Sequence, residues 1–283
     1  MRDIPISIIL ILTIYCCSNS NNDDWEKAQL PTMEDKLFRQ VGNITYFFNS
    51  DISIDDRNAM IKKCKQNIKD NLKMINESEL SDSAYIIFVR DRDEMYKLAN
   101  IRASGTVFTA DFAGTNMVFC IYNEDCPIKH ELMHLVTLCK WNTKKTDISL
   151  AWLSEGLATY ADPETECDGY SFEEKYAAFL QNKMLVSMDS LAENFHRNLY
   201  TEKPDMKDIK IRYNQSAYIV QYLIENYGMN KIKELWQSGM DNFQKIYGKK
   251  IEDILLDIED KLNTKYPNPI DFDWDKFGKR WIK

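Results

Sequence analysis

The sequence is poor in the two residues that punctuate turns. It holds 9 Gly and 7 Pro among 283 residues, well below the usual ~7% and ~5%. Folds built from many short strands need these residues in their tight loops. The shortage therefore argues against a β-sandwich or a β-barrel.

A basic surface is lacking as well. The chain has 36 Lys and Arg against 44 Asp and Glu, which gives a net charge of −8. An acidic chain without a basic cluster is a poor candidate for binding nucleic acid, so we expect no nucleic-acid partner. The hydrophobic fraction of 44% is enough to bury a core, which excludes wholesale disorder.

The N-terminus carries an apolar run that is too short to cross a membrane. Residues 4–15 supply 12 residues, whereas a transmembrane helix needs ~20. The run is typical of a signal peptide. Cys16 and Cys17 follow it, as in a bacterial lipoprotein signal, with Cys17 as the expected lipidation site because Ile14 stands three residues before it. Tyr15 departs from that pattern, and lipidation at Cys16 or plain secretion are the alternatives.

The pattern along the chain predicts an α+β fold in two parts. We expect a signal peptide over residues 1–16, a flexible tether over 17–35, an α/β subdomain over 36–140 and a helical subdomain over 141–283. Strands are predicted at 44–48, 84–89 and 116–122. Helices are predicted at 55–76, 92–100, 127–140, 148–161, 172–184, 214–227, 230–238 and 250–263.

Five cysteines follow the N-terminal segment: Cys64, Cys120, Cys126, Cys139 and Cys167. An odd number leaves at least one unpaired within a single chain. Cys120 and Cys126 are close enough in sequence to pair, although spacing alone does not establish a disulfide.

Two of the three histidines stand four residues apart, with a glutamate directly after the first. His130 and His134 fall on one face of the predicted helix, where both imidazoles can bind one Zn²⁺. Glu131 then reaches the metal-bound water as a general base. A chance occurrence of this spacing in a chain with so few histidines is roughly one in a thousand. The competing interpretation is a surface helix with merely polar histidines.

A hydrolytic zinc site takes a third protein ligand and leaves one position open. One class of metalloproteases has a third His after the second, but Thr137 and Lys140 occupy the corresponding positions here. Glu155 is the candidate instead, because it lies on an otherwise apolar segment where a bare charge is costly to bury. The adjacent Gly156 would then allow close approach to the histidine helix. Alternatively, Glu155 faces solvent or a partner Lys.

The chain resembles the gluzincin zinc metallopeptidases, the thermolysin-like and aminopeptidase-like superfamily of the peptidase MA type. The resemblance covers roughly residues 85–240 and is carried by three segments: His130-Glu131-x-x-His134, Trp152-Leu-x-Glu155-Gly156-x-Ala158, and the helical stretch from Tyr213 to Gly228. It implies a zincin-like fold, with a mixed sheet packed on the histidine helix. It also implies zinc as the cofactor, His130, His134 and Glu155 as its ligands, and Glu131 as the base.

Related enzymes stabilise the oxyanion with a Tyr or His from the helical part. Tyr213 is the candidate here, with Tyr218 and His196 as rivals, although Tyr213 also falls on an apolar stripe where it would simply pack. In thermolysin-like members, an Asp at the position of Thr159 orients a ligand histidine. Asp162 is the candidate to replace it here.

Two further comparisons with the family bear on substrate. The Gly-x-Met-Glu-Asn segment of aminopeptidases has no counterpart here, which favours an endopeptidase. In the family, a strand before the histidine helix edges the cleft and pairs with an extended peptide. The strand at 116–122 is either that edge or an internal strand.

The sequence thus predicts an exported, lipid-anchored zinc metallopeptidase of the cell envelope, with a peptide or protein as its substrate. The alternatives are an envelope lipoprotein that binds a peptide or partner through a structural or inactive zinc site, and a zinc hydrolase acting on something other than peptides.

Overall fold

The computed structural model describes residues 26–27, 33, 35–101, 103–109, 114–122, 126–141, 148–163, 168–193, 195 and 205–278. The chain divides between Lys140 and Trp141 into two compact units. The predicted lipidation site, Cys17, and its rival Cys16 lie outside the described residues.

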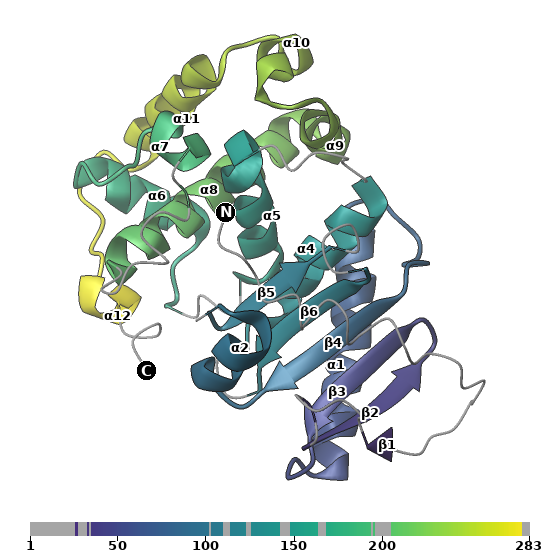
Figure 1. Cartoon of the computed structure of the whole chain (residues 1–283). Helices are drawn as coiled ribbons and strands as arrows, with labels where there is room; N and C mark the ends of the chain where they lie inside the picture. The colour runs from purple at the N-terminus through teal and green to yellow at the C-terminus, as the bar shows by residue number, and fades with distance from the viewer. Residues whose placement is uncertain are drawn as a thin grey trace. The chain divides into compact units, whose positions relative to one another are not determined.

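The first unit is built on a six-stranded mixed sheet (Figure 1). Its strands are β1 (Glu26–Lys27), β2 (Lys36–Val41), β3 (Ile44–Asn49), β4 (Ala84–Val89), β5 (Gly105–Phe108) and β6 (Asn116–Ile121). Their order is β1-β2-β3-β4-β6-β5. The β3–β4 and β4–β6 pairs are parallel, whereas β1–β2, β2–β3 and β5–β6 are antiparallel.

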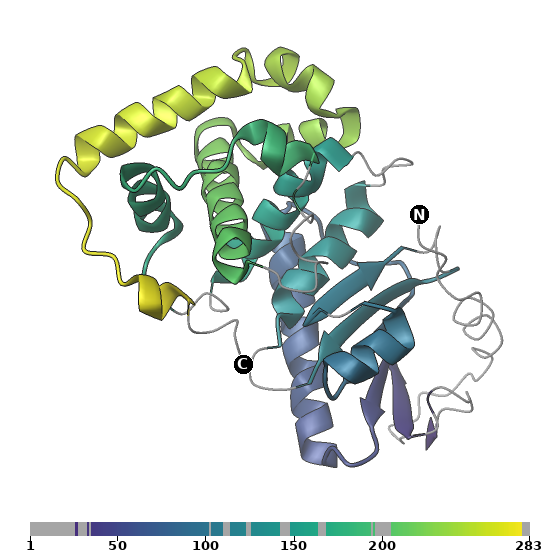
Figure 2. The same ribbon diagram turned by 60° about the vertical axis from the view of Figure 1, so that its left-hand side comes forward.

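Helices cover both faces of this sheet. Helix α1 (Ile54–Met74) and helix α2 (Arg92–Ala99) lie on opposite sides of it in both views (Figures 1 and 2). Met95, Leu98 and Ala99 of α2 pack on alternate residues of the strands, such as Ile87 and Phe119. Strand β4 occupies the predicted residues 84–89, and it is almost continuously apolar because the parallel strands are covered on both faces.

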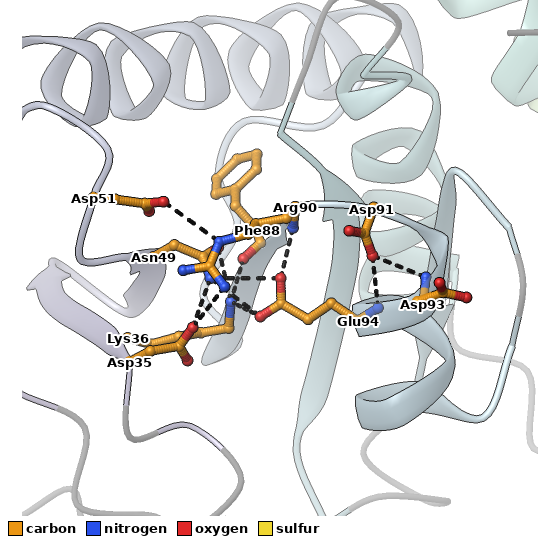
Figure 3. A network of polar contacts seen from close by, with 9 residues as sticks. All are labelled: Asp35, Lys36, Asn49, Asp51, Phe88, Arg90, Asp91, Asp93 and Glu94. Carbon is orange, nitrogen blue, oxygen red and sulfur yellow. Dashed lines mark hydrogen bonds and ion pairs between the residues drawn. The ribbon is translucent and has the colours of Figure 1, made fainter.

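A buried lysine joins the ends of three strands to α2 (Figure 3). Lys36 is fully buried, and its Nζ donates to Asn49 Oδ1 (3.1 Å), the Phe88 carbonyl (2.8 Å) and Glu94 Oε1 (2.7 Å). Burial lowers the pKa of the Lys36 ammonium, and the Glu94 carboxylate opposes that shift. Each of the three ammonium protons therefore has an acceptor, and the Lys36 side chain links β2 to β3, β4 and α2.

The second unit is helical. It contains the 3₁₀ turn η1 (Ile148–Leu150) and the helices α5 (Ala151–Ala161), α6 (Phe172–Gln181), α7 (Met188–Glu193), α8 (Met206–Tyr227) and α9 (Met229–Ser238). The 3₁₀ turn η3 (Met240–Asn242), α10 (Phe243–Tyr247), α11 (Ile251–Lys265) and α12 (Trp274–Gly278) follow. Helix α8 packs along α5 and also contacts α6 and α9. It begins earlier than the predicted residue 214, because Asp205 caps it by accepting from the Lys207 and Asp208 amides.

The prediction of an α+β chain is confirmed, since a mixed sheet is followed by a mainly helical part. The strand predicted at 116–122 is the internal strand β6, flanked by β4 and β5, so it is not an edge. The edge on that side is β5, which the sequence patterns did not predict. None of the described helices has both the length and the apolar character that crossing a bilayer requires.

Candidate metal centre

Helix α4 (Ile128–Trp141) carries both histidines of the motif. Pro127 precedes its first residue, a position that suits proline because the missing N–H has no helical partner there. Its inner stripe is fully buried and consists of Ile128, Leu132, Leu135 and Val136. Burial of this stripe fixes the rotation of the helix and therefore the side on which the histidines stand.

The two histidines present their Nε2 atoms to each other. His130 Nε2 and His134 Nε2 are 3.1 Å apart, and the ring centroids are 4.8 Å apart. Two nitrogens bound at ~2.0–2.1 Å to one tetrahedral zinc ion would lie about 3.3 Å apart. The observed separation thus matches two imidazoles directed at a single metal ion.

Glu131 lies in a crowded environment on the same helix. Its side chain is 7% exposed. A Cβ atom built on Gly105, at the start of β5, would fall 2.5 Å from Glu131 Oε1 and 2.6 Å from Glu131 Cδ. A residue larger than glycine would overlap the carboxylate unless Glu131 or β5 moved, so β5 packs closely against Glu131 at this residue.

A buried side chain of α1 holds the first turn of α4. Asn71 is fully buried, and its Nδ2 donates to the Lys129 carbonyl at 3.0 Å. Lys129 directly precedes His130, so this hydrogen bond anchors the turn that carries His130 and Glu131.

Glu155 stands on α5, most of whose other residues are apolar. Trp152, Leu153, Leu157 and Ala158 of this helix are fully buried. At the neighbouring Gly156, a Cβ atom would fall 2.6 Å from the Ser216 carbonyl oxygen of α8. The expectation that Gly156 admits the histidine helix is therefore corrected, because the close neighbour is the α8 backbone. The glycine allows the tight packing of α5 on α8.

His130, His134 and Glu155 form a group that could bind a metal ion. Each offers one ligand atom, and these atoms all lie within 4.8 Å of one another. All three side chains are half-buried. Two imidazoles and one carboxylate are the donor set of several catalytic zinc sites, which retain an open position.

The candidates for oxyanion stabilisation differ in their surroundings. Tyr213 is half-buried on α8 and packs edge-on against Phe195, with ring centroids 5.1 Å apart. Tyr218 is 1% exposed, and its hydroxyl donates to Glu173 at 3.3 Å. Burial and the Glu173 carboxylate raise the pKa of Tyr218. His196 lies outside the described residues.

Thr159 and Asp162 are both buried at the C-terminal end of α5, at 3% and 7% exposure. The Asp162 backbone N–H donates to the Thr159 carbonyl and closes the last turn of the helix. The proposed substitution of Asp162 for the missing Asp stays a prediction.

Sequence reasoning missed the part played by Gly105. The strand β5 has four residues, Gly-Thr-Val-Phe, which is too short for a periodic pattern. The β-branched Thr106 and Val107 were the available signal.

Comparison with known proteins gives one finding. The family model of the Peptidase MA superfamily matches residues 98–258. No curated protein matches the chain. The matched segment includes β5, β6, α4 and α5, and thus every residue of the candidate metal centre.

Proposed function

The chain belongs to the peptidase MA superfamily, and on that premise we propose that it is a zinc-dependent metallopeptidase of the gluzincin type. The observation that carries the proposal is the group His130, His134 and Glu155, with ligand atoms within 4.8 Å of one another. His130, His134 and Glu155 would hold the ion. When bound, zinc would lower the pKa of a water molecule toward ~7 and polarise the substrate carbonyl.

The remaining chemistry falls to Glu131. Its carboxylate takes the proton of the attacking water and delivers it to the leaving amine of the cleaved peptide bond. Its low exposure of 7% strengthens electrostatic interactions at the carboxylate, because little water screens them. Tyr213 is proposed as the additional donor to the oxyanion, since the Tyr218 hydroxyl is already directed at Glu173.

The sheet edge supports a peptide substrate. Among the described residues, β5 has β6 as its only strand neighbour. An extended peptide can add to such an edge by main-chain hydrogen bonds. Because β5 begins at Gly105, against Glu131, a peptide paired with β5 would run past the base. This arrangement and the missing aminopeptidase segment favour an endopeptidase.

The test combines metal analysis with cleavage profiling of a diverse peptide library. We expect about one equivalent of zinc per chain. Cleavage should be lost on chelation and restored by zinc, and His134→Ala should lose the metal. Zinc content unchanged in His134→Ala would refute the ligand set. Stoichiometric metal without cleavage of any peptide would instead favour the partner-binding lipoprotein with a structural or inactive site.

We also propose export and lipid anchoring at Cys17 in the cell envelope, on the apolar run of residues 4–15 and the Cys16-Cys17 pair that follows it. In a bacterial host, metabolic labelling with an alkynyl fatty acid should mark the wild-type chain but not Cys17→Ala. Equal labelling of the two chains would exclude Cys17 as the lipid site.

A further inference from the structure

Two cysteines contact each other at the entrance to α4. Cys120 lies in β6, and Cys126 lies two residues before the first residue of α4. Their Sγ atoms are 3.0 Å apart. A disulfide bond measures about 2.05 Å, so the sulfurs need to move only about 1 Å closer to bond.

The environment of the pair favours an uncharged state. Cys120 is fully buried, whereas Cys126 is half-buried. Burial raises the pKa of the Cys120 thiol, and the contact with Cys126 and the nearby Glu131 charge raise it further. The raised pKa keeps Cys120 a neutral thiol, and a disulfide is also uncharged and needs no hydrogen-bond partner, so burial of the site does not oppose a disulfide.

We propose that Cys120 and Cys126 form a disulfide that fastens the end of β6 to the start of α4. The oxidant is a protein or small-molecule disulfide. The half-buried Cys126 thiolate attacks it, forming a mixed disulfide and releasing one thiolate. The Cys120 thiol then gives up its proton and attacks the Cys126 sulfur, and the second thiolate leaves and takes up a proton. Two thiols of the chain are oxidised, and one disulfide of the oxidant is reduced to two thiols.

The position of the bond gives it a consequence for the metal centre. Cys126 precedes His130 by four residues, and Asn71 holds the same turn through the Lys129 carbonyl. The disulfide and this hydrogen bond therefore restrain the turn of α4 that carries His130 and Glu131. The pairing itself is independent of the proposed function, whereas its effect on cleavage rests on that function.

The first test counts thiols in the wild-type chain. Purified protein is equilibrated with glutathione disulfide, denatured, alkylated without reductant and mapped by mass spectrometry. We expect a cross-linked peptide that joins Cys120 to Cys126, with Cys64 and Cys139 alkylated. Alkylation of both Cys120 and Cys126, or a cross-link from either to another cysteine, would overturn the proposal.

The second test measures the restraint on α4 by hydrogen exchange. Reduction of the wild type should speed exchange at residues 128–131 while residues 136–141 are unchanged, and lower the melting temperature by about 5 °C. Cys126→Ser should behave like the reduced wild type with or without reductant. Cys139→Ser, on the far end of the same helix, is the matched control and should keep the response to reductant. Equal exchange in oxidised and reduced wild type would refute the restraint, whatever the result of the cleavage assays.

Discussion

Replacing Glu131 with Gln is expected to lower kcat by roughly 10²–10⁴-fold, the range attributed to a positioned general base. Gln has nearly the same shape as Glu, so it fits the space against Gly105, where Glu131 is 7% exposed. The amide cannot accept the proton of the attacking water. Because Glu131 is not one of the proposed ligands, zinc content should equal that of the wild type.

The readout is single-turnover cleavage of the best library peptide, together with metal analysis of the same samples. Glu79→Gln is the matched control. It removes the same charge at an exposed residue that lies far from the motif in sequence. Wild-type turnover in Glu131→Gln would exclude Glu131 as the base. Loss of zinc in that variant would instead assign Glu131 a part in holding the metal.

The elements that sequence reasoning predicts well have a strong local signal. The strand at 84–89 is a continuous apolar run, and β4 occupies those same residues. The helix predicted at 127–140 differs by one residue at each end from α4, because Pro127 and the apolar stripe define it. The spacing of His130 and His134 follows directly from helical geometry.

The elements that were missed depend on contacts between distant parts of the chain. Strand β2 begins with Lys36, which is fully buried, although a lysine is seldom buried unless its charge is paired. It is buried because Asn49, Phe88 and Glu94 supply its three acceptors, and no local pattern indicates such a set. In the same way, Gly105 has no significance in the sequence until the fold brings Glu131 against it.

The start of α1 differs from the prediction by one residue, and here the reason is a local contact. The helix predicted to start at residue 55 starts at Ile54, and Ser53 caps it by accepting from the Asp56 amide, with Asp55 and Asp56 just inside it. Both aspartates stand in the first turn, where the positive end of the helix dipole stabilises their negative charges. The residue types were thus informative about the start of the helix, although not about its first residue.

Gly105→Ala is expected to lower kcat by roughly 10–100-fold, because a displacement of about 1 Å at a catalytic group can cost that much. The added Cβ would lie 2.5 Å from Glu131 Oε1, so either the carboxylate or the strand β5 must shift. Gly105 is therefore a positioning residue rather than a catalytic one. The backbone of Gly105 has no positive φ, so the effect comes from lost space and not from backbone strain.

A lower kcat at unchanged zinc content would distinguish this positioning role from a general disruption of the folded site. Gly105→Ala should keep its zinc, because the three atoms nearest to the added Cβ all belong to Glu131, which is not a proposed ligand. Thr106→Ala is the control on the same strand. Side chains alternate along a strand, so Thr106 lies on the face opposite to that of Gly105. This variant should leave kcat within about two-fold of wild type, since changes away from a site are usually small. If both variants lose activity equally, the loss comes from a weakened β5. If Gly105→Ala is fully active, Glu131 tolerates a shift and the close approach of β5 has no part in catalysis. We predict that kcat falls in Gly105→Ala alone and that this variant retains its zinc. That result would mean that the edge strand β5 fixes the position of the base, Glu131.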